Sequence, residues 1–259
     1  MSKRTFGLLV LCALSLSAFA AQSASAITGT TAFTCKETGA GDFTKAHCKA
    51  ADAGAGKFSH VVIPQNTTTE ITGTNEKTGS ETTSKTVAVI QTAATSVGIF
   101  VFEATGVSIT GSLTNKVFEN GEHYVEGPMT MTLTGVTASS PPGCKIAGGK
   151  IESVPLIATS AGQGMELQLA PKEGAKFFEF TTESCSNPAL NTKGTVTGST
   201  NGTLDGATLT FTEAETTAQK SLKVGFMGMI VGFGGSITLS GRSVGGGAYT
   251  PLSYTTVQT

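Results

Sequence analysis

The stretch MTMTLT, from Met129 to Thr134, alternates strictly between apolar and hydroxyl side chains. Successive side chains of a β-strand point to opposite faces, so this period of two predicts a strand with one face on a core and the other in water. The same alternation recurs in four later segments, which are 165–169, 207–212, 222–226 and 236–240. The pattern is typical of antiparallel sheets that are covered on one side.

Residues that favour tight turns separate the alternating segments, and short strands divided by such turns are typical of sandwiches and barrels. The sequence therefore predicts an all-β, mainly antiparallel sandwich or barrel-like fold with disulfide-stapled loops. The turn sequences are Asn120-Gly121, Pro141-Pro142-Gly143, Lys172-Glu173-Gly174, Asn201-Gly202 and Asp205-Gly206.

Other segments give further expectations. Ile27–Cys35 predicts a first strand, and Phe58–Ile63 predicts a short strand that ends at Pro64. The apolar run around 97–102 predicts a strand covered on both faces. The polar segment 64–86 fits either an exposed strand pair or a mobile loop, and 213–222 could form one or two helical turns.

The composition disfavours nucleic acid as a partner. Charged residues make up 14% of the 259 residues, well below the usual ~25%. The lysines are scattered singly along the chain, whereas nucleic-acid binding needs clustered Lys and Arg. Thr, Ser and Gly take the place of the charged residues, and this composition favours β-structure.

The first 26 residues have the pattern of a secretory signal peptide. Lys3 and Arg4 give a positive start, and an apolar run extends from Phe6 to Phe19. Ala24-Ser25-Ala26 fits a small-x-small cleavage site, and Ala18-Phe19-Ala20 is a second candidate. The chain is therefore expected to be secreted, to the extracellular space or the cell surface.

Cleavage after Ala26 would leave one β-domain over residues 27–259, with a possible sub-boundary in the 64–86 or 138–149 loops. The longest later apolar stretch, Val224–Phe233, is interrupted by glycines and is short of the ~20 residues of a spanning helix. No transmembrane segment is therefore expected after signal cleavage. That stretch is interpreted as a buried strand; the alternative is an apolar ligand site or a protein contact.

Four cysteines remain after cleavage, and an even number in an exported chain predicts two disulfides. Three pairings are possible, and we favour Cys35–Cys48 and Cys144–Cys185 because they close the shortest loops. In the chain-entropy model these closures contribute roughly 3 and 4 kcal/mol. The first disulfide would staple a loop over residues 36–57.

A zinc site near Cys48 is the alternative, since His47 is adjacent and His60 is close in sequence. Zinc sites usually contain closely spaced ligand pairs, and adjacent residues of a strand point to opposite faces. The spacing in this chain lacks such a pair, so no metal ligand and no cofactor is expected.

One segment matches the nucleophile-elbow motif G-x-S-x-G, namely Gly241-Arg242-Ser243-Val244-Gly245. In α/β-hydrolases the acid and the histidine follow the serine, but residues 246–259 contain no Asp, Glu or His. The match is therefore interpreted as chance in a chain rich in Gly and Ser, and no catalytic residue is assigned.

Histidines and carboxylates are scattered along the chain, and we interpret them as surface or strand-edge residues. Paired carboxylates could hydrolyse glycosides if held ~5–9.5 Å apart. The absence of Trp weakens a carbohydrate site, because such sites often use aromatic platforms. The residues weighed are His47, His60, His123, Asp42, Asp52, Asp205, Glu119, Glu122, Glu213, Glu215, Tyr124, Tyr249 and Tyr254.

Several short motifs resemble uncharacterised secreted proteins of high-G+C Gram-positive soil bacteria. They are Phe33-Thr34-Cys35-Lys36, the segment Phe43 to Cys48, and a Cys144 to Cys185 segment with Gly148-Gly149-Lys150 and Pro155-Leu156. The resemblance covers most of the mature chain and implies export and an extracellular β-fold. It implies no activity and no functional residue.

Three functions are compatible with these features. The favoured one is a non-catalytic secreted or cell-surface protein that binds an extracellular protein or an envelope component, or contributes to the envelope. The second is a carrier of a small apolar ligand or lipid, with a cavity between sheets around residues 224–239. The third is an extracellular hydrolase whose site is assembled from scattered acids.

Overall fold

The computed structural model describes residues 31–75, 87–92, 99–141, 143–160, 166–214, 222–224 and 229–255. The expected signal peptide, Pro142, Met165, Glu215 and most of the 213–222 helix prediction lie outside these residues. The strands are β1 (Thr31–Phe43), β2 (Ala53–Val62), β3 (Thr68–Thr74), β4 (Ala88–Thr92), β5 (Val101–Ala104), β6 (Gly106–Val117), β7 (His123–Thr134), β8 (Thr137–Ser140), β9 (Lys145–Ile146), β10 (Lys150–Ser153), β11 (Leu156–Ser160), β12 (Glu166–Pro171), β13 (Lys176–Glu183), β14 (Lys193–Gly198), β15 (Thr200–Asp205), β16 (Thr208–Thr212), β17 (Leu222–Val224), β18 (Met229–Ser243) and β19 (Thr250–Thr255). Short 3-10 helices are η1 (Ala50–Asp52), η2 (Ala147–Gly149) and η3 (Pro188–Leu190).

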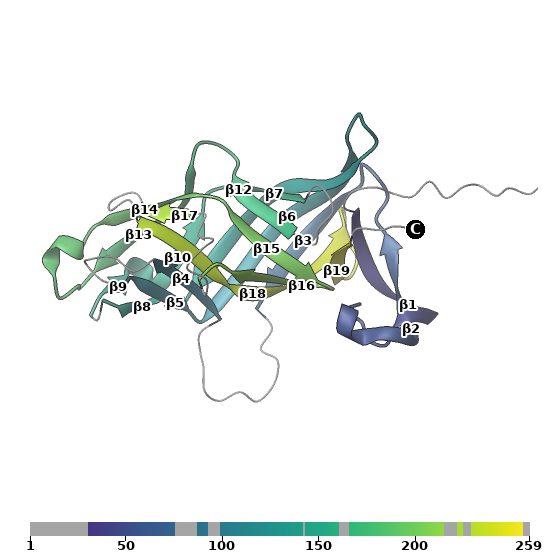
Figure 1. Cartoon of the computed structure of the whole chain (residues 1–259), viewed down its shortest axis with the longest axis horizontal. Helices are drawn as coiled ribbons and strands as arrows, with labels where there is room; N and C mark the ends of the chain where they lie inside the picture. The colour runs from purple at the N-terminus through teal and green to yellow at the C-terminus, as the bar shows by residue number, and fades with distance from the viewer. Residues whose placement is uncertain are drawn as a thin grey trace, which may run out of the picture.

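The expected all-β, antiparallel fold is confirmed, and it is a closed barrel of 12 strands. The ladder runs β18-β4-β5-β8-β9-β13-β10-β7-β11-β12-β15-β16 and returns to β18. Two shorter routes also join β18 to this ladder, through β3 and β6 to β7 and through β17 and β14 to β13. Figure 1 shows the resulting elongated barrel.

Several strands that follow one another in the chain pair with the same neighbours and run in the same direction, so together they form one longer, interrupted strand. Counted in this way, the barrel has eight strand positions around its wall. For example, β3 and β4 both pair with β18 on one side; on the other side β3 pairs with β6 and β4 pairs with β5. Each position is antiparallel to the next in chain order, which is an up-and-down barrel. The positions are β3/β4, β5/β6, β7/β8, β9/β10/β11, β12/β13, β14/β15, β16/β17 and β18.

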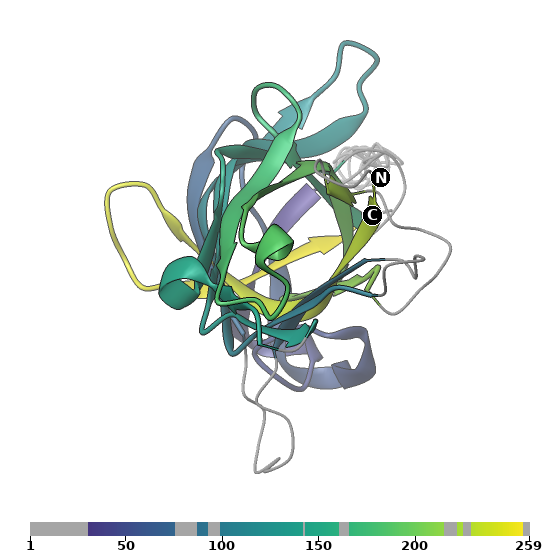
Figure 2. The same ribbon diagram turned by 90° about the vertical axis from the view of Figure 1, so that its left-hand side faces the viewer.

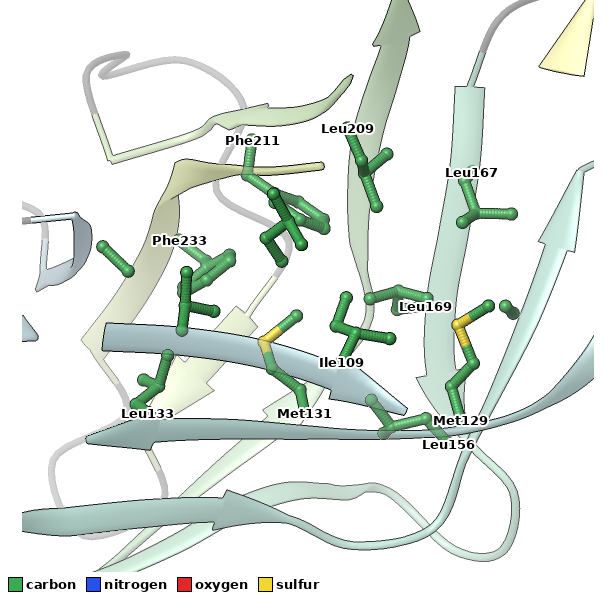
Figure 3. Close-up of a cluster of buried hydrophobic side chains, with 14 of the residues drawn as sticks. Ile109, Met129, Met131, Leu133, Leu156, Leu167, Leu169, Leu209, Phe211 and Phe233 are labelled. Carbon is green, nitrogen blue, oxygen red and sulfur yellow. The ribbon is translucent and has the colours of Figure 1, made fainter. Parts of the chain in front are cut away.

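Apolar side chains from all around the barrel fill its interior. In the stretch from Met129 to Thr134 the apolar side chains are buried and the threonines lie on the outer face. Figure 3 shows Ile109, Met131, Leu169 and Phe233 converging from different strands. An eight-position barrel is just wide enough for such side chains to fill.

Two sequence-based expectations about strands were wrong. β5 alternates between half-exposed and buried residues, so it is covered on one face only, because its other face is the outside of the barrel. The 36–57 segment is not a continuous loop, since β1 extends to Phe43 and β2 begins at Ala53. In 64–86, the described part contains β3, whose inward residues Thr69, Ile71 and Gly73 are buried.

One end of the barrel is covered by β1 and β19, which pair with each other and join the barrel at β18. Figure 2, a view along the long axis, shows the purple N-terminal strand within the outline of the barrel. Ala32 and Leu252 belong to the core cluster. The buried side chain of Asn115 on β6 accepts from Ala32 N at 2.9 Å and donates to Ala32 O at 3.1 Å and Ile63 O at 2.7 Å.

Both favoured disulfides are present. Cys35 on β1 is bonded to Cys48, in the loop before β2. Cys144, in the β8–β9 turn, is bonded to Cys185, which follows β13. The first disulfide fixes the β1–β2 hairpin, and the second joins two connections that lie 41 residues apart.

Candidate functional site

Several acidic side chains of the described residues form ion pairs. Five carboxylates have a cation within 3.2 Å, and most of these pairs lie on the outer surface of the barrel. The pairs are Lys45–Asp52, Lys116–Glu126, Lys150–Glu152, Lys176–Glu179 and Arg242–Glu70. Each of these carboxylates neutralises a neighbouring cation, which is a structural role.

Glu152 and Glu179 form a candidate carboxylate pair that sequence reasoning missed. They lie opposite each other on β10 and β13. Lys150 Nζ lies 2.7 Å from Glu152 Oε2, and Lys176 Nζ lies 2.7 Å from Glu179 Oε2. The hydrogen bond and charge of Lys176 lower the pKa of Glu179, whereas a general acid needs a raised pKa. The four side chains therefore form an exposed ionic cluster without the features of a glycosidase site.

His60 is the most strongly constrained histidine. Its ring centroid lies 5.3 Å from that of Phe33 and 4.6 Å from that of Phe43. Burial lowers the pKa of His60, while the Cys48 backbone and the Asp42 charge oppose this shift. The neutral imidazole therefore acts as a packing residue beside the Cys35–Cys48 disulfide.

Acidification is expected to destabilise the protein through His60. Because the pKa in the folded state is lowered, the unfolded chain binds the proton more readily, and stability falls as pH decreases below about 6.5. Urea unfolding at several pH values between 5 and 8 measures this slope. His60→Gln should flatten it and His123→Gln should not; equal slopes in both variants would contradict the assignment.

The other two histidines lie in different parts of the fold. His47 is half-buried in the turn before Cys48. His123 begins β7, and its ring nitrogen lies 3.4 Å from Nε2 of Gln65. In the portions of the chain that are described, no three His, Cys, Asp or Glu side chains form a group that could hold a metal ion.

The G-x-S-x-G segment is not a strand-to-helix elbow. Ser243 is the last residue of β18, an antiparallel strand. Arg242 Nε donates to Glu70 Oε2 at 2.6 Å, and its guanidinium lies 4.6 Å from the Tyr249 ring centroid. Arg242 therefore ties the end of β18 to β3 and to the segment before β19.

The β6–β7 hairpin carries an exposed aromatic pair. Phe118 and Tyr124 stack with centroids 4.0 Å apart, and Phe118 is 43% exposed. Glu119 and Glu122 lie in the turn between these aromatic residues. The hairpin extends beyond the barrel wall as the tall loop at the upper right of Figure 1.

A groove of about 270 Å³ lies between β4, β18 and the end of β16. Val89 lies opposite Gly234 in the β4–β18 ladder, so the missing side chain leaves space beside the valine. Ala214 forms the other side, since a Cβ on Gly234 would approach the Ala214 Cβ to 2.9 Å. The lining residues are Val87, Ala88, Val89, Gln91, Ala214, Gly234 and Gly235.

Comparison of the chain with protein-family models, with curated proteins and with solved structures gave no match. Among the residues with a described conformation, no helix has the length and apolar character needed to cross a membrane. The functional conclusion therefore rests on the geometry of this barrel.

Proposed function

We propose that the chain is a non-catalytic exported protein that binds a partner at the cell surface or contributes to the envelope. The observation that carries the proposal is the interior of the barrel. Its side chains come from every position around the wall and are buried. Among the described residues, these side chains take up interior positions at which a barrel of this size could hold a small ligand.

The polar chemistry of the described residues supports the same proposal. The carboxylates at Glu70, Glu126, Glu152 and Glu179 neutralise cations on the outer surface. His60 packs between aromatic rings. Export is supported by the N-terminal pattern and by two disulfides, which persist in oxidising compartments.

Expression of the full chain in a Gram-positive host tests export and envelope binding together. We expect mature protein beginning at Ile27 in the medium or on the wall, and cosedimentation of purified mature protein with isolated cell walls. A control chain with Lys3→Glu and Arg4→Glu should be retained in the cell. Cytoplasmic full-length protein would refute export, and a failure to cosediment with walls would refute the envelope role.

The groove beside Gly234 favours a second candidate, a carrier of a small apolar ligand. Val87, Val89 and Ala214 give it apolar walls, and Gln91 supplies one polar group. Such a lining is typical of small-molecule sites, although its volume is just below their usual range of about 300–1,000 Å³. Gly234 and Gly235 fall within residues 224–239, around which the alternative carrier hypothesis placed its cavity.

Filling the groove distinguishes the two candidates. If the groove binds apolar ligands, the mature protein should enhance the fluorescence of 1-aminoanthracene. Val89→Phe should reduce that signal at least tenfold by occupying the groove. Val117→Phe, an exposed site on β6, is the matched control and should leave the signal unchanged. Equal signals from both variants would eliminate the carrier.

A further inference from the structure

Among the described strands, β2 is the one that pairs with a single other strand. The barrel strands have partners on both sides. In the covering sheet, the order is β18-β19-β1-β2, so β2 comes last. Phe58 lies opposite both Glu37 and Phe43, but the following residues, Ser59–Val62, are paired with β1 alone. We call the backbone of Ser59–Val62 that faces away from β1 the β2 edge.

The β2 edge has the side chains of a pairing surface. Ser59, His60, Val61 and Val62 carry no formal charge at neutral pH, and Val62 is 45% exposed. Monomeric β-proteins usually protect such edges with Lys or Pro within the strand. In this chain Lys57 lies within β2 but two residues before Ser59, and Pro64 follows the strand, so neither falls in the four-residue run.

The β2 edge is also held in an extended conformation before any partner arrives. His60 packs between Phe33 and Phe43. The Cys35–Cys48 disulfide fixes β1, and Ile63 N donates to Ala32 O at 3.2 Å at the end of the edge. A preformed strand loses little conformational entropy when it pairs.

We propose that two copies of this chain associate through their β2 edges, as antiparallel neighbours about a two-fold axis. Ile63 N donates to β1, so by alternation the N–H and C=O groups of His60 and Val62 point to the free side. A two-fold axis at Val61 would place His60 of one copy opposite Val62 of the other. Self-pairing needs no charge complementarity, which fits the uncharged edge better than recognition of a charged peptide. This inference goes beyond the proposed function and holds for either candidate.

The position of the edge permits this association. In Figure 1, β1 and β2 lie at the extreme right of the elongated molecule, so the two barrels would extend away from the contact. Closed two-fold dimers are the commonest oligomers of soluble proteins. Four residues on each side bury far less than the ~1,200 Å² of a stable interface, so we expect a weak dimer that forms at tens of micromolar or above.

Sedimentation velocity of the mature protein over a range of concentrations tests the proposal. The wild type should shift from monomer to dimer, and Val62→Lys should remain monomeric at every concentration. Val244→Lys is the matched control, because Val244 is 60% exposed and lies after β18. A wild type that stays monomeric at 1 mM, or a Val62→Lys protein that dimerises normally, would overturn the proposal.

Hydrogen exchange on the wild-type protein gives a second measurement that needs no variant. The amides of Ser59–Val62 should exchange more slowly as concentration rises, since half of them would gain a partner strand. The amides of Gly234, Gly235 and Thr238, which already have a paired strand on both sides, should not change. Slowing at other surfaces without slowing at the β2 edge would exclude this interface.

Discussion

Asn115→Leu is expected to lower the free energy of unfolding by about 2–6 kcal/mol. The Asn115 side chain is 2% exposed and makes three hydrogen bonds to the backbone of Ala32 and Ile63. Leucine has a similar size but neither donates nor accepts, so Ala32 N and Ile63 O would lose their partner at about 1–3 kcal/mol each, whereas Ala32 O still accepts from Ile63 N. Urea unfolding of the mature protein, followed by circular dichroism, measures the loss.

Two further variants separate the hydrogen bonds from packing. Asn115→Asp keeps the shape but points a second oxygen at two carbonyls, so it should also destabilise, and less so at low pH where the carboxyl can donate. Asn120→Leu is the control, because Asn120 accepts from Glu122 N in an exposed turn. A cost of Asn115→Leu below 1 kcal/mol would show that β1 does not depend on this residue.

Removal of the Cys144–Cys185 disulfide by a double change to serine is expected to cost about 4 kcal/mol, because a loop of 41 residues becomes free in the unfolded chain. The same change at Cys35 and Cys48, with a separation of 13 residues, should cost about 3 kcal/mol. Denaturant unfolding of both variants and the wild type measures the difference.

The control is a measurement in reducing buffer, which breaks both disulfides. There the free energy of unfolding of the wild type should fall by the sum of the two contributions, and that of each serine variant by the contribution of its remaining disulfide. A larger loss from the Cys35–Cys48 variant would contradict the ranking by loop length. In that case native contacts around the β1–β2 hairpin, including His60, would dominate over chain entropy.

The local alternation of side chains allowed the fold class to be predicted but not the closure. The period of two in Met129–Thr134 is the same in a sandwich and in a barrel. Closure depends on β18, whose 15 residues pair with β3 and β4 on one side and with β16 and β17 on the other. No local pattern reveals which distant strands will meet.

The candidate sites were harder to predict for the same reason. Glu152 and Glu179 lie 27 residues apart in sequence and meet only through the β10–β13 register. Asn115 did leave a signal, since it continues the inward phase of Val107, Ile109 and Leu113 with a polar side chain. A polar residue at such a position indicates a buried hydrogen-bonding role.

The up-and-down order has a consequence for the time at which the barrel can form. Neighbouring positions are also neighbours in sequence, except where β3 and β4 meet β18. During synthesis the N-terminus emerges first, so β3 and β4 are made early. One edge of each lacks its partner until β18 has been made, near the end of the chain. The edge of β1 that pairs with β19 lacks its partner for longer still, because β19 is the last strand of the chain. A chain terminated before β18 would therefore contain all the preceding strands but could not close the barrel. Such open sheets are prone to aggregation.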